Sequence, residues 1–135
     1  MPAIVRWPGM TRPGATSDHP VITMDWSATL VAAAGAKPDA KYPLDGENQL
    51  ATFTGKQSPA DRTFFWRIRA QGGMRSGKWK YVRVGTSEAL YDLSVDEHEN
   101  ADYSTLRPDK LADLQAQFKA WESQMLSYPK PETSK

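Results

Sequence analysis

Cysteine is absent from the 135-residue sequence. A chain without thiols cannot form a disulfide, a thiolate metal site or a cysteine nucleophile, so those chemistries are excluded for its own residues. The absence leaves the redox compartment open, because cysteine-free chains occur in every compartment.

Long apolar runs are also absent, since no stretch approaches the roughly 20 residues that a transmembrane helix needs. The N-terminus has neither the basic nor the apolar region of a signal peptide. We therefore expect no membrane partner and, for the chain as written, a cytoplasmic location.

Net charge is small, because 17 Lys and Arg residues oppose 16 Asp and Glu residues and leave a formal charge of +1. Both signs are scattered along the chain, whereas nucleic-acid binding requires a gathered basic face. The sequence therefore predicts no nucleic-acid partner.

The first part of the chain reads as a strand, a loop and a helix. Residues 3–7 are rich in β-branched and aromatic side chains and end at a Pro-Gly turn. Residues 26–34 form the expected helix, capped by Thr23 or Asp25 and ended by Gly35. Its expected apolar face comprises Trp26, Leu30, Ala33 and Ala34. Residues 36–62 are polar and broken by proline and glycine, which is typical of a connection.

The second part has the rhythm of an antiparallel meander. Strand-like runs separated by glycine-bearing turns cover residues 63–69, 73–76, 79–84 and 88–93. Ile68, Tyr81 and Leu90 alternate with polar residues, as expected of a sheet with one wet face. The other face needs a cover. A helix that starts near Pro108 supplies it, with an apolar stripe of Leu111, Leu114, Phe118, Trp121 and Met125.

These patterns predict an α+β fold. A small antiparallel β-sheet of about four strands is covered by a C-terminal α-helix, and a strand-loop-helix segment precedes it. We expect the segment with its connection at residues 1–58, the sheet-and-helix subdomain at residues 59–128, and a disordered tail at residues 129–135.

Candidates for hydrolytic chemistry are few, because the chain has only two histidines. Ser17 or Ser76 with His19 or His98 could in principle supply a nucleophile and a base for an esterase-like activity. No serine lies in a G-x-S-x-G turn, and a Ser17-His19 spacing of two carries no specific geometry. A loop histidine before a proline is the structural alternative for His19.

Two polar stretches resemble ligand-binding loops without matching their spacing. The acidic run Asp96–Asp102 offers oxygen ligands but lacks the calcium-loop pattern, so a solvated turn is the better interpretation. The run Gly72–Lys78 lacks the G-x-x-x-x-G-K-[ST] spacing of a phosphate loop, and a hairpin turn accounts for it better. The five tryptophans are interpreted as packing residues rather than a sugar platform.

An ordered series of sequence pieces resembles the C-terminal portion of arylsulfatases, over roughly residues 2–126. No piece is decisive alone, but their order is specific. The pieces are Pro2–Gly9, Ser17–Val21, Met24–Leu30 with Ala34–Ala36, Leu44–Gly46, Arg75–Tyr81 and Glu88–Leu93.

The resemblance implies that the opening strand belongs to a large α/β catalytic domain like that of alkaline phosphatase, and that the meander and its helix form the small C-terminal subdomain. Sulfatases use a formylglycine made within a C/S-x-P-S/A-R motif, a calcium ion held by Asp and Asn, and Lys, Arg and His around the sulfate. None of these motifs is present; Ser58-Pro59 stands in the wrong order and without the arginine. We therefore carry no catalytic or metal residue across and expect no cofactor in this chain, although full-length relatives are often periplasmic or secreted.

The chain departs from the family pattern at three places. Residues 45–55 read D-G-E-N-Q-L-A-T-F-T-G where the family usually has D-G-x-S-L-x-P-L-L-x-G. Ala28 replaces the usual proline before Thr29, and Asp96–Glu99 replace a D-P-x-E turn.

The leading hypothesis is thus a truncated or stand-alone sulfatase C-terminal region, a structural and substrate-cleft subdomain without sulfate ester turnover of its own. The esterase-like hydrolase is one alternative. The other is a module that binds a sulfated glycan through Arg67, Arg69, Arg75, Lys78, Lys80 and Arg83. We also expect self-association through residues 3–7 and 26–34, because a strand and a helix that lose their packing partners expose apolar side chains.

Overall fold

A computed structural model describes residues 2–128 of the chain. The chain divides into two compact units, Met1–Ala60 and Asp61–Lys135, called here the N-terminal and the C-terminal unit. The tail predicted at residues 129–135 lies outside the described residues.

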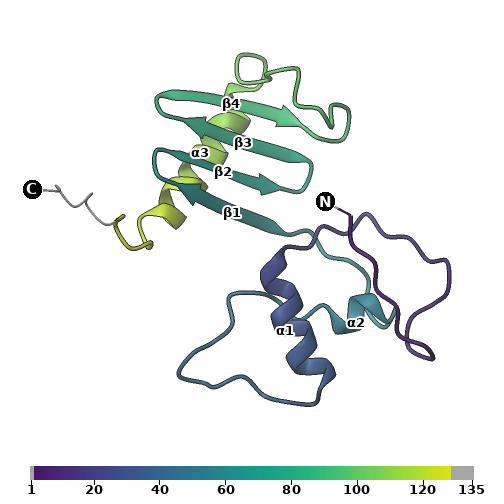
Figure 1. The fold of residues 1–135 in the computed structure, drawn as a ribbon. Helices are drawn as coiled ribbons and strands as arrows, with labels where there is room; N and C mark the ends of the chain where they lie inside the picture. Colours follow the sequence, from purple (N-terminus) through teal and green to yellow (C-terminus); the bar gives the residue numbers. More distant parts are fainter. Residues whose placement is uncertain (1, 129–135) are drawn as a thin grey trace, which may run out of the picture. The chain divides into compact units, whose positions relative to one another are not determined.

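The C-terminal unit is built on a four-stranded antiparallel sheet in the order β1-β2-β3-β4, as the meander predicts (Figure 1). Its strands are β1 (Thr63–Ile68), β2 (Gln71–Ser76), β3 (Trp79–Val84) and β4 (Ser87–Asp92). Short turns join them. Of the run Gly72–Lys78, interpreted as a hairpin turn, only Gly77 and Lys78 form the turn between β2 and β3, and residues 72–76 belong to β2; Gly77 has φ 56°, a conformation that glycine adopts without strain.

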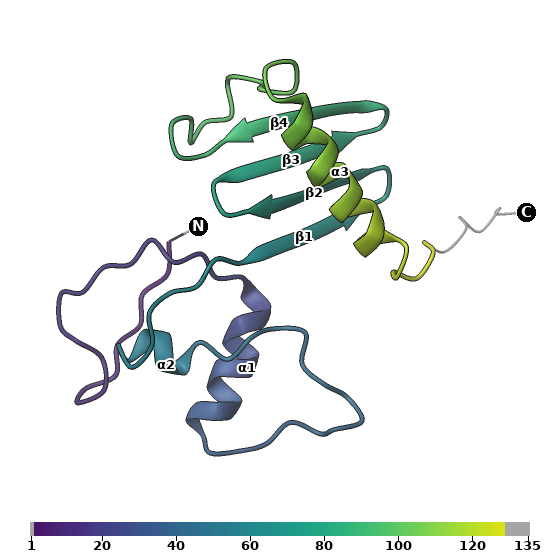
Figure 2. The ribbon, with the colours of Figure 1, turned by 180° about the vertical axis from the view of Figure 1, so that it is seen from behind.

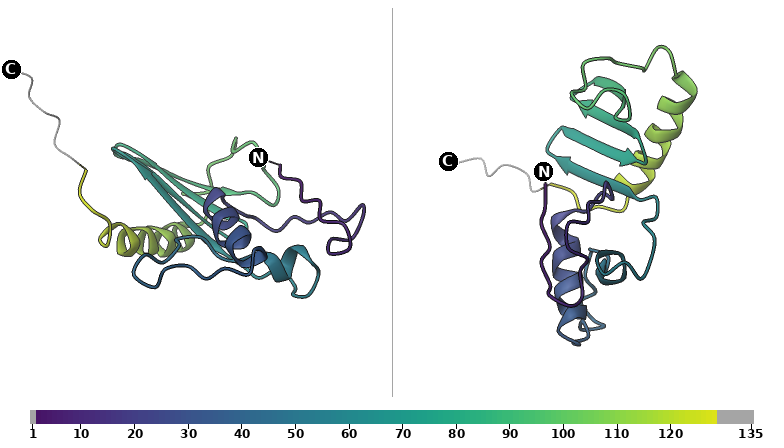
Figure 3. Two further views of the ribbon diagram at one scale, coloured as in Figure 1. Left: turned by 60° about the horizontal axis from the view of Figure 1, so that its bottom comes forward. Right: turned by 90° about the vertical axis from the view of Figure 1, so that its right-hand side faces the viewer.

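Helix α3 (Pro108–Glu122) crosses one face of this sheet, as Figure 2 shows. Its first turn contains Pro108, whose missing N–H costs no hydrogen bond at that position. In Figure 3 the sheet and α3 form two layers. The predicted cover is confirmed except at Met125, which lies beyond the end of the helix.

The core of this unit lies between the two layers. The register aligns Phe65, Met74, Tyr81 and Leu90 in one row across the four strands. Leu114 and Phe118 of α3 are buried in the same cluster. Because neighbouring residues of a strand point to opposite faces, Ile68 belongs to the other face, and its grouping with Tyr81 and Leu90 was wrong.

The N-terminal unit contains α1 (Thr23–Ala33) and the single turn α2 (Leu50–Phe53). Ile22, not Thr23 or Asp25, stands at the cap position. Asp25 acts from inside the first turn, where its Oδ2 accepts a hydrogen bond of 2.9 Å from the N–H of Ile22. Gly35 follows the helix at φ 69°, as predicted for a helix end.

Two expectations for this unit fail. Residues 3–7 are not a strand, because a strand needs a paired neighbour and no strand of the four-stranded sheet pairs with them. The buried face of α1 comprises Asp25, Ala28 and Thr29, whereas Leu30 is 63% exposed. Ile4 is 93% exposed. Self-association through residues 3–7 and 26–34 stays a prediction. It depends on exposed apolar side chains such as Ile4 and Leu30.

No helix among residues 2–128 combines the length and the apolar character that crossing a bilayer requires.

Candidate functional site

The predicted serine and histidine pairs do not assemble. His19 uses its backbone N–H to donate a hydrogen bond of 3.2 Å to Ser17 Oγ, while its Nε2 lies 3.0 Å from Gln49 Oε1. His98 lies exposed in a turn, and Ser76 Oγ accepts a hydrogen bond from Thr63. Within residues 2–128, neither imidazole has a hydrogen bond to a serine hydroxyl, so no nucleophile is paired with a base.

The predicted basic set is divided by the sheet. Arg67 and Arg83 point to the α3 side, whereas Arg75 and Lys80 belong to the alternate rows. Lys78 lies in the turn between β2 and β3, and Arg69 follows β1 at φ 54°. The structure therefore does not bring these side chains together on one face.

Most of these cations already have carboxylate partners. Glu122 of α3 receives two hydrogen bonds from Arg83, of 2.7 and 2.9 Å, and lies 4.0 Å from Arg67. The bond from Arg83 outweighs burial and holds the pKa of Glu122 below its usual value. These charged contacts join α3 to the sheet, so Arg67 and Arg83 have a structural role in this unit.

Lys78 and Lys80 are paired as well. Lys78 Nζ donates to Asp92 Oδ2 at 2.7 Å, and Lys80 Nζ donates to Glu99 Oε1. Burial opposes ionisation of Asp92, but the hydrogen bonds from Lys78 and Ser94 prevail and lower its pKa. Such paired cations have little capacity left for a sulfate group.

The acidic run Asp96–Asp102 forms a hydrogen-bonded turn. Asp96 Oδ2 accepts a bond of 2.8 Å from the N–H of Ala101, and Asp102 Oδ1 accepts bonds from the N–H groups of Leu90 and Ser104. Burial disfavours the charged form of Asp102, but these backbone bonds prevail and lower its pKa. The run closes the outer edge of β4.

The resemblance implies that the calcium site of a complete sulfatase is formed by residues outside this chain. Within the described part of the chain, no three His, Asp or Glu side chains gather closely enough to hold a metal ion. The formylglycine motif is likewise missing from the sequence. We derive no step through either group.

The N-terminal unit contains a buried polar network that was not predicted from the sequence. Asp25 Oδ1 accepts a hydrogen bond of 2.9 Å from the N–H of Glu47, and Thr29 Oγ1 accepts one of 2.9 Å from the N–H of Gln49. Asp25 and Thr29 are buried, and their spacing of four puts them on one face of α1. That spacing of polar residues on a buried face was the available signal.

Gly46 lets this loop reach the helix. A Cβ atom at position 46 would lie 2.1 Å from the carbonyl oxygen of Met24, closer than any side chain permits. Residues 45–49, expected to be part of a connection, are therefore packed against α1 by a glycine and by two side chains of the helix. This network has a structural role, because Asp25 and Thr29 are hydrogen-bonded to backbone groups.

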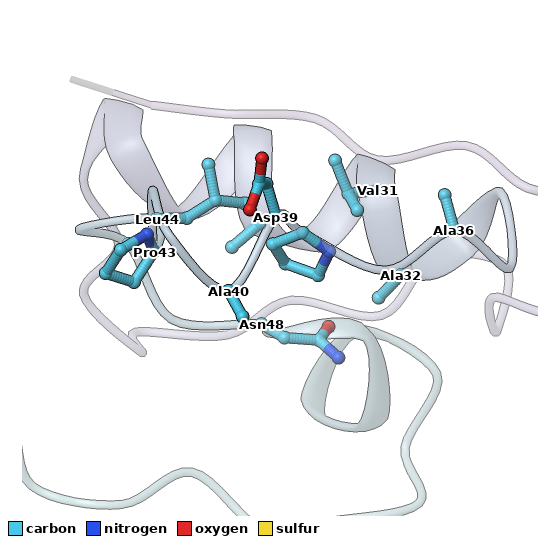
Figure 4. A pocket seen from close by; sticks show the side chains of 11 residues that line it. Val31, Ala32, Ala36, Asp39, Ala40, Pro43, Leu44 and Asn48 are labelled. Carbon is cyan, nitrogen blue, oxygen red and sulfur yellow. The ribbon is translucent and has the colours of Figure 1, made fainter.

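Beside this loop lies a hollow of about 410 Å³ (Figure 4). Its lining is mostly apolar and small, and includes Val31, Ala32, Pro43 and Leu44. Asp39 also lines it, but its Oδ1 accepts a hydrogen bond from the N–H of Lys41. Asn48, the other polar side chain of the lining, accepts a hydrogen bond of 2.9 Å from the N–H of Leu50.

Comparison with known proteins identifies the region. No family model matches the sequence. An uncharacterized sulfatase of Schizosaccharomyces pombe is 29% identical over 128 residues, which cover 84% of this chain and 23% of the yeast protein.

Solved structures agree with that match. The crystal structure of Ps i-CgsB superposes with a TM-score of 0.71 at 27% identity, over 85% of this chain and 27% of that one. The "putative sulfatase yidJ" of Bacteroides fragilis has a TM-score of 0.63 at 20% identity and supports the fold alone. The chain spans about a quarter of the length of the proteins that it matches. In sequence and in fold, the chain therefore matches the C-terminal region of sulfatases.

Proposed function

We propose that the chain serves as the C-terminal subdomain of a sulfuric ester hydrolase and hydrolyses no sulfate ester by itself. The observation that carries this proposal is the match to sulfatases over 84% of this chain but only 23% of the relative. A region of that extent contributes packing and part of a substrate cleft, while the formylglycine and its metal come from elsewhere in the enzyme.

The substrate class of the complete enzyme is proposed from one solved relative. Ps i-CgsB, which is 27% identical, has been determined in complex with a neocarrahexaose. We infer that the enzyme to which this region belongs acts on sulfated carbohydrates.

The first test is an assay of the purified chain with an activated aryl sulfate. We expect hydrolysis at the rate of the buffer blank, because the chain offers no activated nucleophile. The variants His19→Ala and His98→Ala are controls for the two possible bases. A rate above the blank that either substitution removes would contradict the proposal.

The second test uses a chimera in which this chain replaces the matching region of Ps i-CgsB. We expect a folded chimera that still binds the neocarrahexaose with which Ps i-CgsB was determined. A chimera that folds but no longer binds it would limit the chain to a scaffold role, and one that does not fold would refute the proposed function.

A further inference from the structure

Strand β1 forms one edge of the sheet, because it pairs with β2 alone (Figure 1). The N–H of Gly77 donates to the carbonyl oxygen of Arg62, which shows that the even-numbered residues of this segment direct their main-chain groups toward β2. Thr63, Phe65 and Arg67 therefore direct theirs outward. Among residues 2–128, the outward N–H and C=O groups of Thr63 and Phe65 have no hydrogen-bond partner. Such an edge is a template for another strand.

The two edges of the sheet are covered to different extents. At β4, the carbonyl oxygen of Leu90 accepts a hydrogen bond of 2.7 Å from the N–H of Tyr103, and its N–H donates one of 3.0 Å to Asp102. At β1, the hydroxyl of Tyr128 donates a hydrogen bond of 2.9 Å to the outward carbonyl oxygen of Arg67. Residues Leu126–Tyr128, called here the strap, thus supply the cover of the β1 edge.

The side chain of Arg67 holds the strap in place. Its guanidinium donates a hydrogen bond of 2.6 Å to the carbonyl oxygen of Leu126, and its Cζ lies 4.7 Å from the centroid of the Tyr128 ring. Glu122, the last residue of α3, lies 4.0 Å from the same guanidinium. Tyr128 is 45% exposed and lies outside the hydrophobic core, so the strap can leave the edge without unfolding the sheet.

The sequence of β1 favours pairing with a copy of itself. It reads T-F-F-W-R-I, which is rich in aromatic and β-branched residues, contains one charge and lacks proline. Antiparallel pairing of two such edges about Phe65 would place Arg67 opposite Thr63 of the second copy, so no like charges would meet. Each outward N–H would face an outward carbonyl oxygen, as two-fold symmetry requires of a self-complementary edge.

We propose that the strap keeps the outer edge of β1 from pairing with the same edge of a second copy. In the register centred on Phe65, the N–H of Thr63 needs the carbonyl oxygen of Arg67 as its acceptor. Tyr128 occupies that oxygen, and two-fold symmetry repeats the loss at the other end of the paired strands. Displacement of the strap opens the edge, and the two four-stranded sheets join into one.

The experiment follows the full chain by sedimentation equilibrium and by hydrogen exchange at the Phe65 amide. Tyr128→Ala should lower the dissociation constant for self-association by about tenfold or more, because an acceptor at each end becomes available. Exchange at Phe65 should then slow as the protein concentration rises. Leu126→Ala is the matched control, because its side chain is 91% exposed and Arg67 holds only its carbonyl oxygen; it should change neither quantity.

A second substitution shows whether the β1 edge is the surface that pairs. Thr63→Lys, at an exposed position, places a cation opposite Arg67 of the second copy, and like charges directly opposite each other destabilise a strand pair. Added to Tyr128→Ala, it should restore the dissociation constant and the Phe65 exchange rate of the wild type. Thr63→Val, which keeps the β-branched shape without a charge, should not restore them.

Three results would overturn the inference. The first is a Tyr128→Ala chain that associates no more tightly than the wild type. The second is association that persists equally in the variant with Thr63→Lys, which would assign it to another surface such as residues 3–7. The third is a wild-type chain whose Phe65 amide is already protected in a concentration-dependent way, since the strap would then not prevent pairing.

Discussion

Gly72→Ala tests the packing between β2 and α3. A Cβ atom built at position 72 lies 2.4 Å from Cζ of Phe118 and 3.1 and 3.2 Å from the two Cε atoms. The Phe118 ring cannot simply retreat. It is 1% exposed, with the Tyr81 and Trp121 rings 5.5 and 5.6 Å from its centroid. The substitution should therefore force either the ring or the helix to move.

The expected magnitude follows from two opposing effects. Overpacking a well-filled core costs about 1–3 kcal/mol, while replacing a glycine by alanine gains about 0.4–1 kcal/mol through the unfolded chain. We expect a net loss of about 1–2 kcal/mol in the free energy of unfolding, a large share of a typical stability of roughly 5–15 kcal/mol. Urea unfolding followed by far-ultraviolet circular dichroism measures it.

A double-mutant cycle shows whether Phe118 is the cause. Phe118→Leu removes part of the ring that the new methyl group meets, so the double variant should be more stable than the two single losses together imply. We expect a coupling of about 1 kcal/mol. A Gly72→Ala protein as stable as the wild type, or strict additivity in the cycle, would refute this account of the contact.

Three further predictions concern interactions that stabilise other parts of the chain. Asp25→Ala should accelerate hydrogen exchange at the Glu47 amide and cost about 3 kcal/mol locally, because two N–H groups lose a charged acceptor; slow exchange in the variant would count against it. Gly46→Ala should likewise accelerate hydrogen exchange at the Glu47 amide, because its Cβ atom would meet the carbonyl oxygen of Met24. Arg83 lowers the pKa of Glu122 in the folded state, so its contribution to stability is present above the ordinary glutamate range and is lost as the pH falls through the folded-state pKa. Glu122→Gln should flatten that part of the pH profile of urea unfolding, and an unchanged slope would disprove the linkage.

The sheet and α3 could be predicted because their signals are local. Alternating strand-like runs between glycine turns, and an apolar stripe after Pro108, each require only neighbours in sequence. The residues on the core face of the sheet could not all be predicted, because the face on which Ile68 lies depends on the register of β1 with β2. A shift of one residue moves a side chain to the other face, and the sequence pattern of β1 is apolar on both.

The misses in the N-terminal unit have a different cause. Residues 3–7 have the composition of a strand, but pairing is a property of two segments and composition describes one. The network of Asp25 and Thr29 joins α1 to a loop about 20 residues away. Because the partners in that loop are backbone N–H groups, these bonds require no particular residue type there and leave no pattern in the sequence. The candidate site residues do not come together in the structure. Which face of the sheet each of them lies on depends on strand register and on pairing between distant segments, and neither can be read from the positions of charged and polar residues alone.

That choice of backbone groups explains how this loop tolerates divergence. Asp25 and Thr29 hold the N–H groups of Glu47 and Gln49, and every residue except proline supplies such a group. The hydrogen bonds from α1 therefore constrain the backbone at positions 47 and 49 rather than the residue type, whereas position 46 has to be glycine because a Cβ atom there would meet the carbonyl oxygen of Met24. The side chain of Gln49 is held separately, by His19. A search for distant relatives would do better with an aspartate and a threonine four apart, followed by one spaced glycine, than with the loop sequence itself.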